Sequence, residues 1–239
     1  MNLTVDTTYR SDLPEIMDDL DMKGEQLRDT LDKIAGLNRK LGGNSLTLEG
    51  VKQLIKKIPM EQEIRIVDVG CGNGDMLRDL ADFGDQTGRK FKLSGIDANE
   101  DTISYARKMS LHYPDISYSC QNIFHPDFEK NQCDIVICTL TLHHFSDSQI
   151  ISLLKKFRKQ SAIGIVINDL HRSAIAYRLF QLVCYVFGLG AMPTNDGLIS
   201  ILRGFKKSEL RNFSRKLNFE KYSIRWKWAF RYQWIISTL

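Results

Sequence analysis

Short apolar runs and amphipathic segments alternate along the chain from residue 64 onward. IRIVDVG is a short run rich in β-branched residues, and FKLSGIDA, ISYSCQ, CDIVICTLTL and AIGIVINDL also have the length of buried strands. Between them lie segments with helical spacing of apolar residues, such as DMLRDLADFG and SDSQIISLLKKFRKQ. Because buried strands that alternate with helices indicate a parallel sheet covered on both faces, we predict an α/β, Rossmann-like sheet flanked by helices.

The N-terminal part of the chain departs from this alternation. It shows helical spacing and no strand pattern, which predicts an N-terminal helical cap over 1–58 and a main domain over 59–239. Within the cap we expect one helix over 14–41, stopped by the Gly-Gly pair that follows it, and a second helix over about 46–58.

The C-terminal part also breaks the order. We expect a long apolar helix at about 171–188, a loop over 192–197 (MPTNDG) and a further helix that begins near Lys206. Two β-like runs, 219–228 and 230–237, lie close enough to pair as a hairpin. Together with the five earlier runs, they predict a seven-stranded sheet, mostly parallel, with an antiparallel C-terminal hairpin strand at its edge.

The composition is that of an ordinary globular protein, with 43% hydrophobic and 26% charged residues and a net charge of +4. So small a basic excess does not support nucleic-acid binding. The first residues lack the apolar core of a signal peptide. The longest apolar stretch, 174–191, contains Arg178 and Gln181, so we expect no transmembrane segment, although this stretch could lie against a membrane. These features predict a cytoplasmic protein.

The cysteines favour neither a disulfide framework nor a metal site. The chain has five of them, an odd number, and none forms a C-x-x-C pair. We therefore predict reduced, mostly buried thiols and no bound metal.

The stretch VDVGCGNGD places three glycines directly after the first predicted strand. Their spacing, Gly70-x-Gly72-x-Gly74, differs from the G-x-G-x-x-G of dinucleotide sites, and Asp75 would repel a pyrophosphate at the sixth position. No Gly-Lys-Ser/Thr follows, which excludes a triphosphate loop. A glycine loop bracketed by the carboxylates of Asp68 and Asp75 suits a ligand with a cationic head group instead.

The motif DVGCGNG resembles the first motif of the class I S-adenosylmethionine-dependent methyltransferases, an acidic residue followed by G-x-G-x-G. S-adenosylmethionine has an ammonium, a carboxylate and a sulfonium, so Asp68 is expected to hold the ammonium while the amides of the loop receive the carboxylate. The loop residues in this expected cofactor site are Gly70, Cys71, Gly72, Asn73 and Gly74.

Further motifs of the family follow at the expected distances. Asp97 ends the next predicted strand, 29 residues after Asp68, where a carboxylate accepts hydrogen bonds from both ribose hydroxyls; capping of the following helix is its other interpretation. The resemblance implies that the rest of the cofactor site consists of Ala98, Gln121, Asn122, Ile123, Thr139 and Leu140. The family often has Asp where Asn122 stands, and an amide oxygen can accept the same bond from adenine.

Candidate bases lie beyond the fourth and fifth predicted strands. Methyl transfer to a hydroxyl or an acidic carbon needs a group that removes a proton from the acceptor. His143 and His144 follow the fourth strand, and Asp169 and His171 follow the fifth. Each histidine could instead cap a helix or bond a backbone carbonyl, and Asp169 could simply order its loop.

The segment 171–205 lies where members of this family build a substrate lid. It carries an apolar stripe, most of which we expect to pack on the core: Ile175, Leu179, Leu182, Val183 and Val186, widened by Phe180 and Phe187. An apolar, aromatic lid favours a hydrophobic small-molecule acceptor such as a phenol, quinol, polyketide or lipid-like molecule.

The flanking segments resemble the ubiquinone/menaquinone-type branch of the family. The expected function is methyl transfer from S-adenosylmethionine to oxygen or carbon in small-molecule biosynthesis, by a monomer or a homodimer. Two alternatives stay open, a non-catalytic S-adenosylmethionine-binding partner subunit and a protein or RNA methyltransferase. The stretch TLTLHHF after the fourth strand lacks the D/N-P-P-Y/F motif of amino-methylating DNA enzymes.

Overall fold

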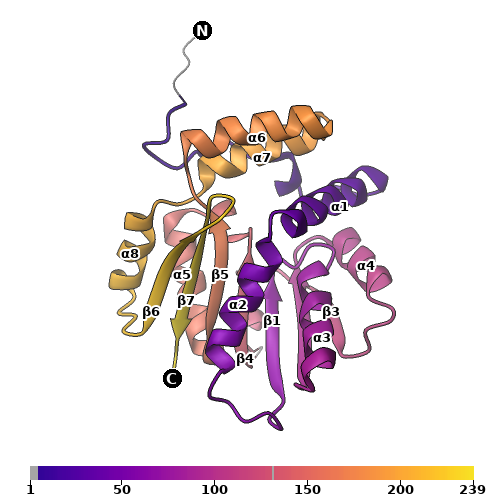
Figure 1. The fold of residues 1–239 in the computed structure, drawn as a ribbon, viewed down its shortest axis with the longest axis vertical. Coiled ribbons are helices and arrows are strands. Elements are labelled where there is room, and N and C mark those ends of the chain that lie inside the picture. The colour runs from indigo at the N-terminus through magenta and orange to yellow at the C-terminus, as the bar shows by residue number, and fades with distance from the viewer. Residues whose placement is uncertain (1–4, 131) are drawn as a thin grey trace.

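A seven-stranded sheet forms the centre of the protein in a computed structural model that describes residues 5–130 and 132–239 (Figure 1). The strands are β1 (Ile64–Val69), β2 (Phe91–Asp97), β3 (Ile116–Cys120), β4 (Cys133–Thr139), β5 (Ser161–Leu170), β6 (Tyr222–Lys227) and β7 (Arg231–Ser237). Their spatial order is β3-β2-β1-β4-β5-β7-β6. The first five strands run parallel, and β7 pairs antiparallel with both β5 and β6. The predicted Rossmann-like sheet with an antiparallel C-terminal hairpin is confirmed.

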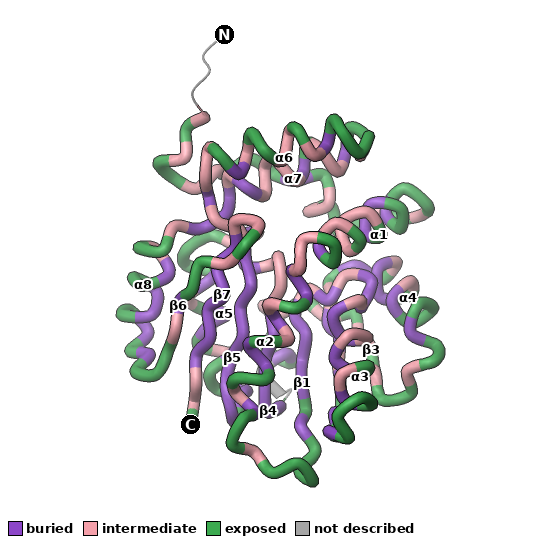
Figure 2. Tube along the Cα trace, in the orientation of Figure 1, coloured by how far each residue is buried: buried purple, intermediate pink, exposed green. Residues whose placement is uncertain are grey.

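Helices cover both faces of the sheet, so its inner strands β1, β4, β5 and β7 are the most deeply buried part (Figure 2). The helices are α1 (Glu25–Lys40), α2 (Gly43–Ile55), α3 (Asp75–Thr87), α4 (Glu100–Met109), α5 (Asp147–Gln160), α6 (Ala174–Phe187), α7 (Ala191–Arg203) and α8 (Lys207–Lys216), with short 3₁₀ turns η1 (Ile16–Asp18), η2 (Pro126–Lys130) and η3 (Leu142–His144). On one face, α2 and α3 bury side chains such as Val51 and Leu77 against the strands. On the other face, α5 and α8 do the same with Phe157 and Phe213.

The order of the strands places a crevice at the centre of the sheet. From β1 the chain proceeds outward to β2 and β3, and from β4 it proceeds to β5 in the opposite direction. The loops that follow β1 and β4 therefore diverge, and ligands of open α/β sheets bind at such a point, beyond the carboxyl ends of the strands.

The predicted N-terminal helices are shorter in the structure than in the sequence pattern. The expected helix over 14–41 is replaced by η1 and by α1, which begins only at Glu25, after Gly24 with φ +85°. The second helix begins at Gly43 and ends at Ile55, earlier at both ends than 46–58. Polar side chains before Gly24 bond to other parts of the protein instead of extending the helix, as described below.

The predicted loop over 192–197 is wrong, because these residues lie inside α7. Pro193 stands in the first turn, where a missing N–H breaks no helical hydrogen bond. Packing also outweighs the turn propensity of this stretch, since Gly197 lies against the ring of Phe180 and Asp196 is 2% exposed.

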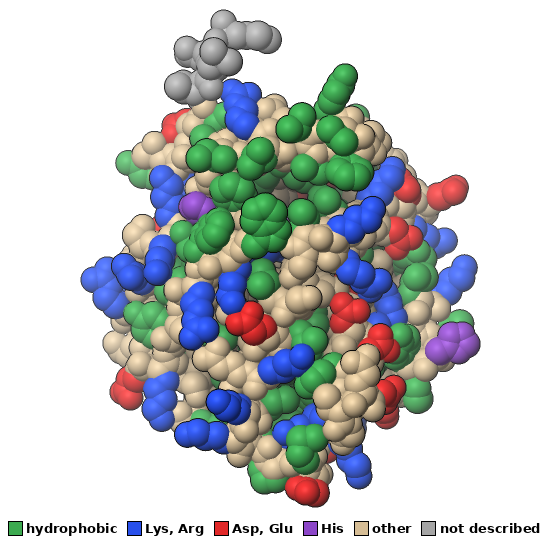
Figure 3. Space-filling model, in the orientation of Figure 1, with side chains coloured by type: hydrophobic (Ala, Val, Ile, Leu, Met, Phe, Trp, Pro, Cys, Tyr) green, Lys and Arg blue, Asp and Glu red, His purple; other side chains and the backbone are tan. Residues whose placement is uncertain are grey.

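The apolar stripe of α6 does not pack on the core as expected. Ile175, Leu179, Leu182 and Val186 are between 47% and 65% exposed, and Phe187 is also exposed. Hydrophobic side chains accordingly gather on the surface over α6 and α7 (Figure 3). None of the helices in the described part of the chain has the length and apolar character needed to cross a membrane.

Candidate active site

A cavity of about 640 Å³ lies beyond the carboxyl ends of the central strands, between the sheet and α1, α6 and α7. It brings together nearly all the residues that the resemblance assigned to the cofactor. Those that line it are Asp68, Gly70, Cys71, Gly72, Asn73, Asp97, Ala98, Gln121, Asn122, Ile123, Thr139 and Leu140. Gly74 does not line the cavity but stands at the N-cap of α3. His143 and His144 line it as well, whereas Asp169 and His171 do not.

The glycine loop turns sharply between β1 and α3, with φ of +73° at Gly70, +52° at Gly72 and +78° at Gly74. Side chains other than glycine rarely adopt these values. A Cβ on Gly70 would also overlap Thr141, and one on Gly74 would overlap the hydroxyl of Tyr118. The loop backbone is therefore held against its neighbours while its inner side faces the cavity.

Asp68 is a buried carboxyl group to which the described residues bring no counter-ion. It is 2% exposed at the end of β1, and its Oδ1 has no hydrogen-bond partner in the structure. Burial, followed by the charges of Asp75 and Asp97, raises the pKa of Asp68 well above its usual range. A ligand that brought a cation to this carboxylate would remove the cost of its burial.

Asp97 connects the end of β2 with the glycine loop. Its Oδ2 accepts a hydrogen bond from the amide of Gly72 at 3.2 Å, and its Oδ1 accepts one from the amide of Asn99 at 3.1 Å. Burial raises the pKa of Asp97 in spite of these bonds. Asn99, rather than Asp97, caps α4, because its side chain accepts from the amide of Thr102.

The residues after β3 and β4 frame the cavity on two further sides. The side chain of Asn122 accepts from the amide of Phe124 at 2.9 Å, which fixes the turn after β3. Leu140 follows β4 with φ +53°, a left-handed conformation that costs about 1 kcal/mol for a side chain of this kind. Its amide donates to the carbonyl of Asn168 at 2.9 Å, which holds this strained residue in place.

His143 and Asp169 form a buried pair beside the cavity. Nδ1 of His143 lies 2.7 Å from Oδ1 of Asp169, and its amide donates to Oδ2 at 3.1 Å. Burial tends to raise the pKa of Asp169, but its interactions with His143, the amide of Leu170 and His144 together lower it. In a neutral imidazole, an ionised Asp169 favours the tautomer of His143 with the proton on Nδ1, which leaves the lone pair on Nε2. Within residues 5–130 and 132–239, this buried Nε2 has no hydrogen-bond partner.

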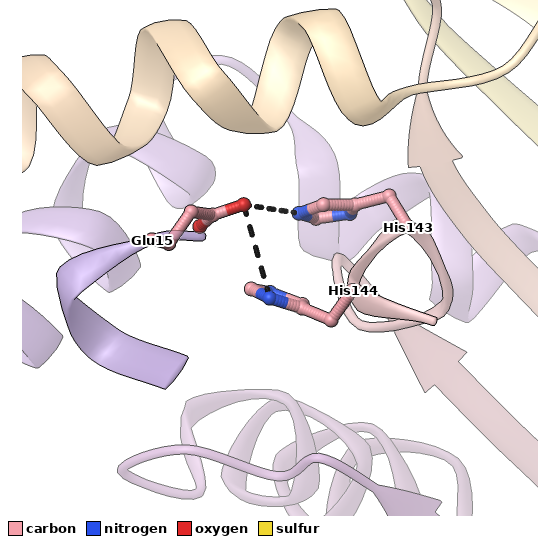
Figure 4. A group of neighbouring side chains, drawn as sticks. All are labelled: Glu15, His143 and His144. Atoms are coloured by element: carbon pink, nitrogen blue, oxygen red, sulfur yellow. Dashed lines mark ion pairs between the residues drawn. The ribbon is translucent and has the colours of Figure 1, made fainter. Parts of the chain in front are cut away.

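Glu15 faces both histidines from the N-terminal segment (Figure 4). Its Oε1 lies 3.6 Å from Nε2 of His143 and 3.8 Å from Nδ1 of His144, and burial raises the pKa of Glu15. The two imidazole rings lie 4.3 Å apart. Nδ1 of His144 is 2.7 Å from Oδ1 of Asp18, whose pKa is lowered by His144 and Arg203 against the effect of burial.

The same three residues have the types found in metal sites. Glu15, His143 and His144 each offer one ligand atom, and these atoms lie within 4.8 Å of one another. Nη1 of Arg203, however, lies 3.6 Å from Oε1 of Glu15. A guanidinium so close to the carboxylate opposes the entry of a second cation. We therefore interpret the group as an acid–base cluster.

His171 lies away from the cavity, against the β6–β7 hairpin. Nε1 of Trp226 donates to its Nδ1 at 3.2 Å, and its ring packs near Phe230 and Tyr232. Burial, with the charges of Lys206 and Arg172, lowers the pKa of His171. Its surroundings are those of a packing residue.

Several polar residues at the site carried no signal in the sequence. Asp196 accepts from the amides of Ile16 and Met17 at 2.9 and 3.0 Å, which ties α7 to the N-terminal segment. Arg203 donates to Asp18 at 2.6 Å, and Arg231 lines the cavity from the start of β7. Each of these contacts joins residues far apart along the chain, which no local pattern reveals.

Comparisons with known proteins agree with this geometry. Residues 66–164, from β1 to β5, match the family model of a methyltransferase domain. The chain matches no curated protein sequence significantly.

Many solved structures share the fold. The plantazolicin methyltransferase BamL, solved with a desmethyl-plantazolicin analog and S-adenosylhomocysteine, has a TM-score of 0.65 at 15% identity, with 90% of each chain covered. The CurJ carbon methyltransferase has a TM-score of 0.60 at 15% identity and covers 81% of this chain and 54% of its own. Magnesium protoporphyrin IX methyltransferase from Synechocystis PCC 6803 has a TM-score of 0.56 at 13% identity, covering 91% and 89%. At these identities the likeness establishes the class I methyltransferase fold.

Proposed function

We propose that this chain, which carries a methyltransferase domain of class I fold, transfers the methyl group of S-adenosylmethionine to an oxygen or carbon atom of a hydrophobic small molecule. One observation carries the proposal. A single cavity has the glycine loop, Asp68 and Asp97 on one side and His143 and His144 on another.

The residues present fit the cofactor. Asp68 has a buried oxygen that lacks a partner, and the ammonium of the methionine group would supply one. Asp97 lies at the end of the adjacent strand, where the ribose hydroxyls would meet it. Similar structures of a magnesium protoporphyrin IX methyltransferase and a plantazolicin methyltransferase, solved with S-adenosylmethionine or S-adenosylhomocysteine, support the same assignment.

The acceptor is expected to be hydrophobic because the remaining walls of the cavity are largely apolar. They are contributed by α1, α6, α7 and the loops after β3 and β4, and include Leu31, Ile34, Phe124, Phe145, Phe180 and Ile201. The similar proteins include a plantazolicin methyltransferase, a porphyrin methyltransferase and a polyketide synthase methyltransferase domain, which supports a small-molecule acceptor. In this proposal, η1 and α1 act as a cap and 171–205 as a lid over the acceptor. Helix α2, the last part of the predicted cap over 1–58, packs on the sheet instead.

The protein's part in the reaction is to orient the acceptor and take its proton. S-adenosylmethionine, when bound, supplies a methyl group made electrophilic by the sulfonium. Nε2 of His143 takes the proton from a hydroxyl or acidic carbon of the acceptor. Asp169 holds the imidazole in the required tautomer and stabilises its protonated form, and His144 with Glu15 bounds the same side of the cavity.

Calorimetric titration with S-adenosylmethionine and S-adenosylhomocysteine tests the proposal first. We expect saturable binding at micromolar concentrations, and its absence at high micromolar concentrations would refute the cofactor assignment. Methyl transfer is then measured on a panel of phenols, quinols and β-keto esters. A non-catalytic binding subunit would bind the cofactor without turnover, and a protein or RNA methyltransferase would use only macromolecular acceptors.

A cytoplasmic location, a monomeric or homodimeric state and contact of the exposed face of α6 with a membrane stay predictions.

A further inference from the structure

Arg231 is a buried arginine whose guanidinium is not satisfied by the protein. It begins β7, is 4% exposed and lines the cavity. Its Nε and Nη1 are both buried, and neither has a hydrogen-bond partner within the described part of the chain. Burial lowers the pKa of Arg231 to about 10, and the charge of Asp169 only partly offsets this.

A second buried arginine shows how such a group is normally accommodated. Arg172 is 1% exposed, and its guanidinium donates to both carboxylate oxygens of Glu209, at 2.6 and 3.0 Å, and to backbone carbonyls. An unpaired buried charge costs several kcal/mol, which the ion pair of Arg172 avoids. Arg231 has no equivalent pair, because Asp169 already bonds His143 and the amide of Leu170.

The guanidinium lies at the N-terminus of α2. A Cβ placed on Gly43, the first residue of this 13-residue helix, would be 3.1 Å from Cζ of Arg231 and would also overlap Asn38. Glycine at this position therefore leaves room for the guanidinium. The N-terminal end of a helix carries partial positive charge, so the guanidinium of Arg231 and the first turn of α2 both favour an anion between them.

We propose that Arg231 and the N-terminal turn of α2 bind a carboxylate of a ligand in the cavity. A guanidinium matches a carboxylate in shape and can donate two parallel hydrogen bonds to it. The carboxylate comes from the methionine group of S-adenosylmethionine, in which case the inference rests on the proposed function, or from the acceptor. Asp68, a buried carboxyl group whose Oδ1 has no partner among the described residues, favours the first source, because a zwitterionic amino acid would place its ammonium there and its carboxylate at Arg231.

The test compares Arg231→Gln with Arg172→Gln as a matched control. If Arg231 is a ligand-binding residue, Arg231→Gln removes an unsatisfied buried charge from the free protein. The melting temperature of the free protein then stays unchanged or rises by about 2 °C. Replacing Arg172 breaks a satisfied pair with Glu209, so it should lower the melting temperature by several degrees. A purely structural Arg231 would instead lower it as Arg172 does.

Two binding measurements then identify the source of the carboxylate. For the cofactor, S-adenosylhomocysteine is compared with its analogue that retains the amino group and lacks the carboxylate. Arg231→Gln should weaken binding of S-adenosylhomocysteine at least tenfold and leave the Kd of the analogue without the carboxylate unchanged. For the acceptor, benzoate and its neutral isostere benzamide are titrated into the protein with and without S-adenosylhomocysteine. Here Arg231→Gln should abolish the preference for benzoate while cofactor affinity stays the same.

Either binding result supports the proposal. It is overturned if Arg231→Gln changes neither S-adenosylhomocysteine affinity nor the preference for benzoate. A wild-type protein that fails to bind S-adenosylhomocysteine would refute the proposed function alone, because the benzoate measurement on the free protein still tests Arg231.

Discussion

Replacing Asp68 by asparagine should separate stability from cofactor binding. In the free protein this carboxylate is 2% exposed and its Oδ1 has no partner, so Asp68→Asn removes a charge that the fold does not use. The free energy of unfolding should therefore stay unchanged or increase. With S-adenosylhomocysteine bound, the variant lacks the charge that holds the ammonium. A hydrogen bond to a charged group contributes about 1.5–3 kcal/mol, which corresponds to a roughly ten- to 150-fold weaker Kd.

The assay is calorimetric titration of both proteins with S-adenosylhomocysteine, combined with thermal unfolding of the free proteins. Asp134→Asn provides the control, since Asp134 is also a buried aspartate of the central sheet but accepts from the amide of Arg65 at 2.7 Å. This control should lower the melting temperature and leave the Kd unchanged. Wild-type affinity in Asp68→Asn, or a loss of stability as large as that of the control, would refute our account of Asp68.

The pH dependence of binding and three substitutions give further predictions. The pKa of Asp68 is raised in the free protein, so this group stabilises the folded free protein at low pH and loses that contribution as the pH rises through its folded pKa. Binding of an ammonium group should therefore tighten with rising pH, by at most about tenfold per pH unit. Titrations with S-adenosylhomocysteine at several pH values measure this change in Kd. Asp97→Ala should weaken cofactor binding at least tenfold, about 1.4 kcal/mol, and wild-type affinity would argue against a ribose contact. His143→Ala should reduce methyl transfer by about 10²–10⁴-fold with an unchanged Kd for S-adenosylhomocysteine, whereas full activity would exclude it as the base. Gly74→Ala should destabilise the protein through overlap with the hydroxyl of Tyr118, and Tyr118→Phe should restore part of the lost melting temperature; no such rescue would mean that φ strain dominates.

The sequence predicts those parts of the fold and site whose signal is local. The strand, the glycine turn and the helix that starts at Asp75 are contiguous, so the spacing of Gly70, Gly72 and Gly74 is sufficient to predict both the loop and its conformation. The same holds for the seven strands, because each is a short run of its own that turn or helical segments bound.

Other features depend on contacts that only the folded chain makes. The stretch over 192–197 has the composition of a loop, but Asp196 bonds the amides of Ile16 and Met17 and the helix continues through it. The stripe on α6 has the spacing of a buried face, yet α6 packs mainly on α7 at the outside of the molecule, and the stripe stays exposed. A periodic pattern predicts that a helix has an apolar face and does not predict what covers that face.

The N-terminal segment around Glu15 and Asp18 links α7 to the two histidines of the cavity. Glu15 contacts the imidazoles through Oε1 and accepts from the hydroxyl of Ser200 in α7 at 2.7 Å through Oε2. Asp18 contacts His144 and Arg203, which is the last residue of α7. Any movement of α7 that widened the cavity would therefore also shift the groups around His143 and His144. Under the proposed function, admission of an acceptor past α7 would therefore be coupled to the placement of the imidazoles, since Glu15 and Asp18 contact both α7 and the histidines.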